Sequence, residues 1–211
     1  MLKESMETRT LSELLEDLRS HITGESISLK VLLGAFHERG FGFFLFLFSL
    51  PAALPVPAFG INALIALPLL LLTAQQAVGR HTIWLPEKWQ SKTISKTKVE
   101  GFITSATPWI KRLEFFIRPR LSFMTQGHIS KLIGVLGFIM ALAVSIPLPL
   151  TNTVPSFGIA MMAIGVLMRD GLAVIGGAIV GTLWVILLVG FVLIYGPEGF
   201  DMVKDFIKGL I

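Results

Sequence analysis

The sequence predicts an all-α integral membrane protein with an internal two-fold repeat, with broken or re-entrant helices in each half and amphipathic helices on its surface. Composition supports the membrane assignment. Of the 211 residues, 53% are hydrophobic and 15% are charged, whereas a soluble domain carries about 25% charged residues. The mean hydropathy is +0.75. An uncharged segment at 172–195 is also long enough to span a bilayer.

The repeat rests on a motif of the form P-x5-P-[AS]-F-G-I that occurs twice, with Phe59 and Phe157 at equivalent positions 98 residues apart. The motif residues are Pro51, Pro57, Phe59 and Gly60 in the first copy and Pro149, Pro155, Phe157 and Gly158 in the second. Prolines break helices, and broken backbone at membrane depth is tolerated only inside protein or beside a wet cavity. Paired interruptions therefore indicate a substrate site between repeats. Pro-rich turns between ordinary membrane helices are the alternative.

Residues 1–40 are predicted to form N-terminal amphipathic helices that lie on the membrane surface or pack on the body. The first covers residues 10–20, where leucines recur at helical spacing. Thr10 and Glu13 form a capping box that starts it.

The second amphipathic helix covers residues 29–36. Ser28 is its expected N-cap and Gly40 its expected C-terminal end. Glu38 and Arg39 are interpreted as a solvated or interfacial helix end at the point of membrane entry.

Residues 41–78 form the first membrane repeat, with a broken helix at 51–57. The segment 41–54 is uncharged but too short for a full span, so it is expected to be a half-helix. After the break, the segment 58–78 is long enough to cross and is interrupted by Pro68.

Residues 79–128 form a basic cytoplasmic or interfacial stretch. It contains nine of the eighteen lysines and arginines, which places it on the cytoplasmic side by the positive-inside rule. Apolar residues keep helical spacing across a helix start at Thr107-Pro108, and tryptophans lie nearby. One or two interfacial helices on an anionic lipid leaflet are therefore expected. Nucleic acid is not the expected partner of a chain this apolar.

Residues 129–195 form the second membrane repeat, with a broken helix at 147–155, and residues 196–211 form a C-terminal amphipathic tail. Gly134 and Gly137 are expected to permit close packing of the apolar segment before the break. The last apolar segment is the clearest spanning helix. Gly177 and Gly181 give it a G-x-x-x-G face, which suits either a homodimer or close packing within the chain.

Each break places a small amide near free backbone groups, Asn62 after the first and Asn152 inside the second. Helix N-termini at Ala58 and Ser156 would favour an anionic ligand if both faced one cavity.

Three charged residues complete the predicted site. Arg169 and Asp170 are functional if they lie at membrane depth, whereas a tight loop at Asp170-Gly171 is the alternative. Arg80 occupies a comparable position after the first repeat, where it binds phosphate or acts as an interfacial anchor.

Nothing in the sequence predicts an enzyme, a metal site or a cofactor. Cysteine is absent, and the four histidines are scattered without metal-ligand spacing.

With these features in place, the chain resembles the ExoD family of bacterial exopolysaccharide-synthesis membrane proteins. The residues that carry the resemblance are Leu11 to Leu15, Arg39 to Gly42, Leu50-Pro51 to Phe59-Gly60, Gly79-Arg80, Trp84 to Pro86, Ile146-Pro147 to Phe157-Gly158, and Arg169 to Gly171. The resemblance implies a role in exopolysaccharide production at the inner membrane, without a defined reaction. The broken helices also look like the re-entrant elements of DedA-type membrane proteins, which is an analogy of architecture.

The sequence therefore leads to two main hypotheses for the function. The leading hypothesis is transport or leaflet exchange of an anionic small molecule or lipid-linked phosphate at the repeat interface, in support of envelope polysaccharide synthesis. The alternative is a membrane scaffold or regulator that binds synthesis enzymes through the basic stretch. Transport favours repeats inverted across the membrane, whereas two re-entrant hairpins place both motifs on the same side.

Overall fold

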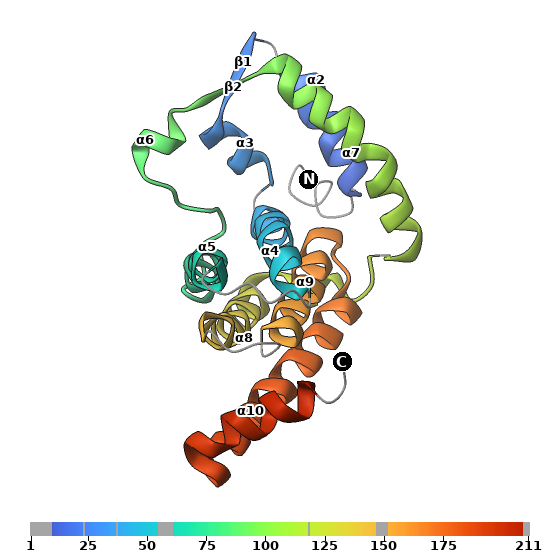
Figure 1. The fold of residues 1–211 in the computed structure, drawn as a ribbon. Helices are drawn as coiled ribbons and strands as arrows, with labels where there is room; N and C mark the ends of the chain where they lie inside the picture. The colour runs from blue at the N-terminus through green and yellow to red at the C-terminus, as the bar shows by residue number, and fades with distance from the viewer. Residues whose placement is uncertain are drawn as a thin grey trace.

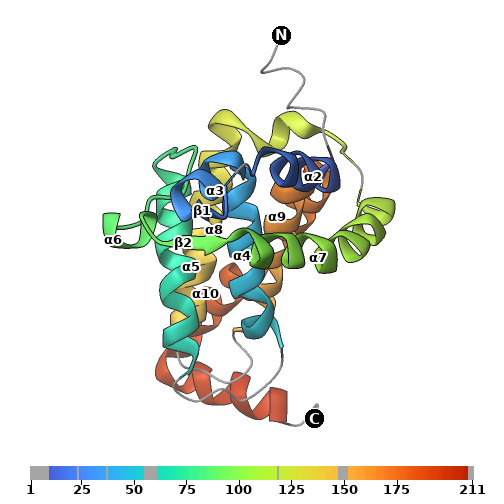
Figure 2. The same ribbon diagram turned by 90° about the horizontal axis from the view of Figure 1, so that it is seen from above.

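The computed structural model describes residues 10–22, 24–36, 38–54, 61–117, 119–146 and 152–208. These residues form a helical bundle and a smaller cap that packs against one side of it, toward one end of the helices (Figure 1 and Figure 2). The bundle contains α4 (Glu38–Ala53), α5 (Ile61–Ala77), α8 (Gly127–Ser145), α9 (Thr153–Met168) and α10 (Gly171–Lys208). The cap contains α2 (Leu11–His21), β1 (Ser26–Ser28), α3 (Leu29–Phe36), α6 (Glu87–Gln90), β2 (Thr93–Ser95) and α7 (Lys96–Phe116).

Helix α2 begins as the sequence predicts. The Glu13 amide donates to the Thr10 hydroxyl at 3.3 Å, and the Thr10 amide donates to the Glu13 carboxylate at 2.9 Å, so the capping box is complete. The apolar face of α2 packs against α7, where Leu15 and Leu18 share a buried cluster with Ile103. The predicted amphipathic helix is confirmed.

The expected helix end at Gly40 is wrong. Helix α3 ends at Phe36, and Gly40 lies inside α4, which begins at Glu38. A Cβ at Gly40 would lie 3.6 Å from the Phe36 Cβ and 3.8 Å from the Ile83 Cδ1. A Cβ here would therefore make ordinary van der Waals contacts, and Gly40 neither ends a helix nor is required for close packing.

The sequence analysis did not predict the two-stranded β-sheet in the cap. Strands β1 and β2 are antiparallel, with Ile27 opposite Ile94. Each strand has three residues, too few to show the alternation that identifies a strand in a sequence. The ladder ties the N-terminal segment to the chain that enters α7.

The bundle is built on two antiparallel helix pairs, α4 with α9 and α5 with α8. A Cβ at Gly42 of α4 would lie 2.7 Å from the Ala163 carbonyl oxygen of α9. In the other pair, a Cβ at Gly134 would clash with the backbone of Gln76 and Ala77. The close packing predicted at this glycine is confirmed, since the two backbones are in contact there.

These pairs give the helical hairpins α4–α5 and α8–α9 the same orientation. The starts of α4 and α8 and the ends of α5 and α9 lie near the cap, whereas the ends of α4 and α8 and the starts of α5 and α9 lie at the opposite end (Figure 2). Residues 78–126 leave the bundle and return to it at the cap end. The ends of both hairpins that point away from the cap therefore lie on the same side of the protein, and the two hairpins are not inverted relative to each other.

Three prolines that were expected to interrupt or start helices lie inside continuous helices. Pro51 is in the last turn of α4, Pro68 is in α5 and Pro108 is in α7. A proline removes only one backbone donor, and in α7 the Thr107 hydroxyl donates to the Ile103 carbonyl at 2.6 Å on the preceding turn. The predicted helix start at Thr107-Pro108 is wrong, whereas α4 ends at Ala53, two residues after Pro51 and within the predicted break at 51–57.

The second predicted break is also shorter than expected. Helix α9 begins at Thr153 and not at Ser156. Pro155 lies in its first turn, where the missing amide hydrogen is not needed for the helix. The residues 55–60 and 147–151 of the two breaks lie outside the described residues.

In the described part of the chain, two helices are long and apolar enough to cross a membrane, Gly127–Ser145 and Gly171–Gly196. The second span ends where Gly196 has a φ of 59° and bends α10. Helices α4, α5 and α9 are apolar but have only 16 or 17 residues, about 25 Å of helix against about 30 Å of hydrocarbon.

The G-x-x-x-G face of α10 packs within the chain. A Cβ at Gly181 would lie 3.4 Å from the Gly158 Cα of α9, and one at Gly177 would lie 2.7 Å from the Met162 amide nitrogen. A homodimer through this face would therefore have to separate α9 from α10.

Candidate functional site

The predicted site residues divide between the two ends of the bundle. Asn152, Pro155, Phe157 and Gly158 lie at the start of α9, away from the cap, whereas Arg169 follows its last residue. The intervening helix is about 20 Å long. The structure therefore does not bring these residues into one site.

Several predicted site residues cannot be placed in either group. Pro57, Phe59, Gly60 and Pro149 lie outside the described residues, and the Asn62 backbone belongs to α5 while its side chain lies outside the description.

The start of α9 is tightly packed. Asn152 is its N-cap residue and is 7% exposed, although its side chain does not cap the helix. Pro155 and Ser156 are fully buried, and the Ser156 hydroxyl has no hydrogen-bond partner among the described residues. Phe157 is 50% exposed, so this motif residue lies on the outer surface of the bundle.

Arg169 and Asp170 form a tight turn between α9 and α10, as the loop interpretation predicts. Arg169 adopts left-handed backbone with a φ of 58° and ends α9. The buried Asp170 carboxylate accepts from the Leu172 amide at 2.9 Å, which caps α10. The Gly171 amide donates to the Arg120 carbonyl at 2.6 Å and ties this turn to the chain that precedes α8.

Arg80 is exposed at the cap end of α5. Its guanidinium carbon lies 5.9 Å from the Trp84 ring centroid, and the Trp84 amide donates to the Gln75 side chain at 2.7 Å. This geometry is typical of an interfacial anchor.

The sequence analysis missed a charged cluster between the cap and the bundle. Arg39, interpreted as a solvated helix end, is only 6% exposed. Its guanidinium interacts electrostatically with the like charge of Arg169 and with the carboxylates of Glu114 and Glu13. The close approach of α4 to α9 at Gly42 places Arg39, near the start of α4, and Arg169, at the end of α9, on neighbouring helices.

Glu114 also joins the two cap helices. One carboxylate oxygen accepts from the Ser12 amide and the other from the Ser12 hydroxyl, both at 2.8 Å. The carboxylate thus sits at the N-terminus of α2, where the helix dipole favours negative charge. The cluster has two cations from the bundle and two carboxylates from the cap.

No sequence signal could have predicted this cluster, because its members come from four helices far apart in the chain. Arg39 and Arg169 belong to segments that carry the family resemblance, but nothing in their spacing shows that they meet. Within the described ranges, no three histidine, aspartate or glutamate side chains gather as a metal site.

The fold and this cluster define an all-helical protein with two helices suited to crossing a membrane and a charged junction beneath a helical cap. The chain belongs to the ExoD family: the family model described as "Exopolysaccharide synthesis, ExoD" matches residues 11–190. The chain is 35% identical over 189 residues to the uncharacterised protein slr1875 of Synechocystis sp., covering 88% of this chain and 89% of the relative. It is 29% identical over 173 residues to Protein ExoD of Rhizobium meliloti, covering 80% and 72% respectively. No solved structure matches the chain.

Proposed function

We propose that this protein is a multi-pass protein of the bacterial inner membrane that supports exopolysaccharide synthesis by binding, and in a transporter-like manner moving, an anionic group such as a lipid-linked phosphate. Membership of the ExoD family supports the link to exopolysaccharide synthesis. One observation favours an anionic ligand: the buried Arg39 guanidinium lies within electrostatic range of Arg169 where the two hairpins meet.

The physical argument starts from the cost of burying charge. Burying a guanidinium destabilises the folded protein unless anions balance its charge. A second guanidinium nearby destabilises it further, because the two positive charges repel each other. Phosphate suits arginine because its oxygens accept paired hydrogen bonds from the guanidinium. In the present structure Glu114 and Glu13 of the cap supply the opposite charge. A phosphate would compete with these carboxylates, so its binding would be coupled to the position of the cap. The proposal includes no catalytic step.

The membrane placement in this proposal follows from the apolar helices. The helix surfaces away from the cap expose large aliphatic side chains, among them Leu64, Leu67 and Leu71 on α5. A soluble protein rarely exposes such contiguous apolar surface. The basic cap would face the cytoplasm.

The test is complementation in a strain that lacks this protein. We expect Arg39→Gln and Arg169→Gln to lower exopolysaccharide output about tenfold or more, since a hydrogen bond to a charged group contributes about 1.5–3 kcal/mol. Arg19→Gln is the matched control, because Arg19 is exposed on α2 and belongs to neither proposed site. Arg39→Lys separates charge from paired hydrogen bonding and should restore only part of the output. Wild-type output from both glutamine variants, at wild-type protein levels, would exclude the arginine site.

The second candidate is a scaffold that binds synthesis enzymes through the cap. It is favoured by the exposed basic side chains around α7, such as Lys92, whose ammonium lies 4.5 Å from the Trp89 ring centroid. In that case a triple neutral variant of Lys92, Lys96 and Lys98 should abolish output, while the arginine variants should be tolerated. The two sets of variants therefore give opposite results for the two functions.

A further inference from the structure

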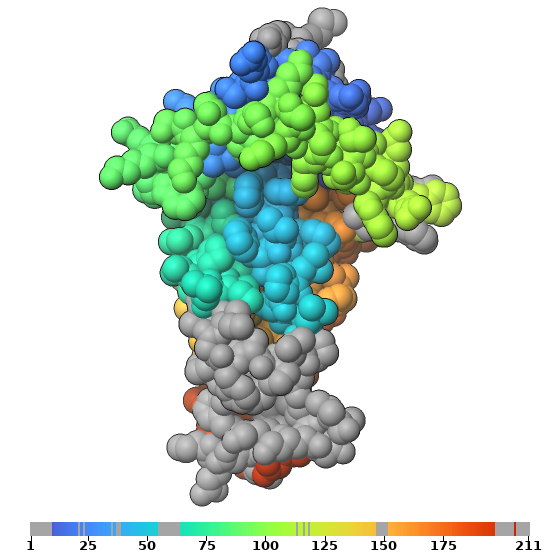
Figure 3. Space-filling view, turned by 45° about the horizontal axis from the view of Figure 1, so that its top comes forward, coloured from blue at the N-terminus to red at the C-terminus, as the bar shows by residue number. Residues whose placement is uncertain are grey.

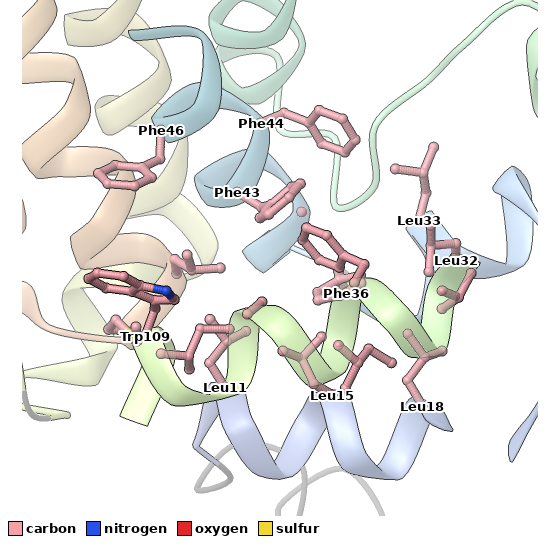
Figure 4. Close-up of a pocket in the computed structure, with 18 of the residues that line it drawn as sticks. Leu11, Leu15, Leu18, Leu32, Leu33, Phe36, Phe43, Phe44, Phe46 and Trp109 are labelled. Carbon is pink, nitrogen blue, oxygen red and sulfur yellow. The ribbon is translucent and has the colours of Figure 1, made fainter. Parts of the chain in front are cut away.

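An apolar cavity of about 500 Å³ lies between the cap and the bundle (Figure 4). Its cap wall comes from α2, α3 and α7, with Leu11, Leu15 and Phe36 pointing into it, and its bundle wall comes from α4 and α9. Among the described residues that line it, Lys98 is the only charged one. The cavity is therefore a hydrocarbon-lined space with one cation.

The size and lining of this cavity suit an apolar ligand. An apolar protein cavity of about 150 Å³ stays dry and binds benzene, and ligand pockets span about 300–1,000 Å³. Water in this cavity would have almost no polar group with which to form a hydrogen bond, so it would not be stabilised there. A flexible hydrocarbon chain gains by transferring its methylene groups out of water.

The cavity opens to the outside along α7, and the opening is aromatic and basic. Phe102 and Trp109 line the cavity, yet they are 51% and 67% exposed. The Arg112 guanidinium carbon lies 5.1 Å from the Trp109 ring centroid. Figure 3 shows the chain from α6 to α7, in green, running as a band across this face above α4. Tryptophan beside lysine and arginine is typical of a membrane interface.

We propose that this cavity binds one acyl chain of an anionic phospholipid, with the phosphate head group beside Lys98. Charge complementarity selects the anionic head group, because Lys98 is exposed at the lining and the rest of the exposed α7 surface nearby, Lys111 and Arg112, is also basic. The lipid chain fills the space between cap and bundle, so it holds the two parts together. This site adjoins the arginine cluster, since Gly40 and Met168 line the cavity next to Arg39 and Arg169 in the chain, but the proposal does not depend on transport.

The first experiment is native mass spectrometry of the detergent-purified protein, with phosphatidylglycerol and phosphatidylcholine of the same acyl chains as probes. Wild-type protein should retain one phosphatidylglycerol per chain in preference to phosphatidylcholine.

Ala106→Phe puts a ring into the cavity, since Ala106 lines it. A ring that displaces two methylene groups of the lipid should lower the affinity for the lipid about tenfold. Ser105→Phe is the matched control on the exposed side of α7. Lys98→Gln should remove the preference for phosphatidylglycerol, whereas Lys88→Gln should keep it, because Lys88 is exposed on α6 and does not line the cavity.

A second measurement does not depend on filling the cavity. A variant with Trp84, Trp89 and Trp184 replaced by Phe keeps Trp109 as the sole tryptophan, and phosphatidylglycerol brominated on its acyl chain should quench its fluorescence. Equal lipid binding by Ala106→Phe and Ser105→Phe, equal binding of the two lipids by wild type, or absence of quenching would each overturn the proposal. Retention of a free fatty acid or a lipid-linked sugar in place of phosphatidylglycerol would also overturn it.

Discussion

Gly158 of α9 and Gly177 of α10 meet backbone to backbone. A Cβ on Gly177 would lie 2.6 Å from the Gly158 carbonyl oxygen, and a Cβ on Gly158 would lie 3.0 Å from the Gly177 carbonyl oxygen. Neither backbone can move aside as a flexible side chain could. The contact therefore sets the distance between the clearest spanning helix and the rest of the bundle, and it leads to the first prediction.

Gly177→Ala should destabilise the folded protein by about 1–3 kcal/mol, because the new methyl group overpacks a contact between two backbones. The measurement is thermal unfolding in detergent, followed by size-exclusion chromatography. Gly190→Ala is the control on the same helix: a Cβ at Gly190 meets nothing within 4 Å, so this change should be neutral or stabilising by up to about 1 kcal/mol. Equal melting temperatures for Gly177→Ala and the wild-type protein would contradict the close contact between the two backbones.

The second prediction concerns the Asp170 cap of α10. Asp170→Ala should cost about 0.5–2 kcal/mol, because the Leu172 amide at 2.9 Å loses its acceptor. Asp170→Ser keeps a capping oxygen and should recover most of that stability. If the effect came from loss of negative charge alone, Ser and Ala would destabilise equally, and thermal unfolding of the two variants separates these cases.

The features that the sequence predicted correctly are local ones. The capping box at Thr10 depends on residues three positions apart, and the close packing at Gly134 depends on a small residue within an apolar run. Both can be recognised without knowing the fold. The turn at Asp170, which was one of two interpretations of the sequence, is also a local feature, because the dipeptide Asp-Gly favours a turn wherever it occurs.

The features that the sequence analysis missed depend on tertiary contacts. Arg39 was assigned to a solvated or interfacial end because its neighbours in sequence suggest one, yet the packing of α4 on α9 buries it within electrostatic range of Arg169. Pro68 and Pro108 were expected to interrupt or start helices, yet both helices continue through them. A proline costs one hydrogen bond, and favourable packing along the rest of the helix offsets that loss.

The third prediction tests whether Glu114 holds α2 onto the cap. Its carboxylate accepts two hydrogen bonds of 2.8 Å from Ser12, and hydrogen bonds to charged groups contribute about 1.5–3 kcal/mol. Glu114→Gln and Ser12→Ala should each speed proteolysis of the N-terminal segment, and the double variant should be no worse than the poorer single variant. Additive effects of the two changes in this double-mutant cycle would show that the pair is not coupled.

The fourth prediction is the orientation of the two hairpins, and the absence of cysteine from the chain makes it accessible. Leu54 and Ile146 are exposed residues that follow α4 and α8 at the end away from the cap, and Lys111 is exposed on the cap. Because the hairpins run in the same direction, single cysteines at Leu54 and Ile146 should react alike with a membrane-impermeant thiol reagent. In the proposed orientation neither should label from the cytoplasmic face.

The labelling of Lys111→Cys provides the reference, since the basic cap should react only in inverted vesicles. Asp205→Cys provides the opposite reference, because Asp205 is exposed beyond the span that ends at Gly196. It should react only in intact cells, where the outer face is accessible. Labelling of Leu54→Cys and Ile146→Cys from opposite faces would contradict the shared orientation and would restore an inverted repeat. Labelling of all four positions from both sides, in sealed membranes, would contradict a membrane-spanning bundle, because only a crossing helix separates the two faces.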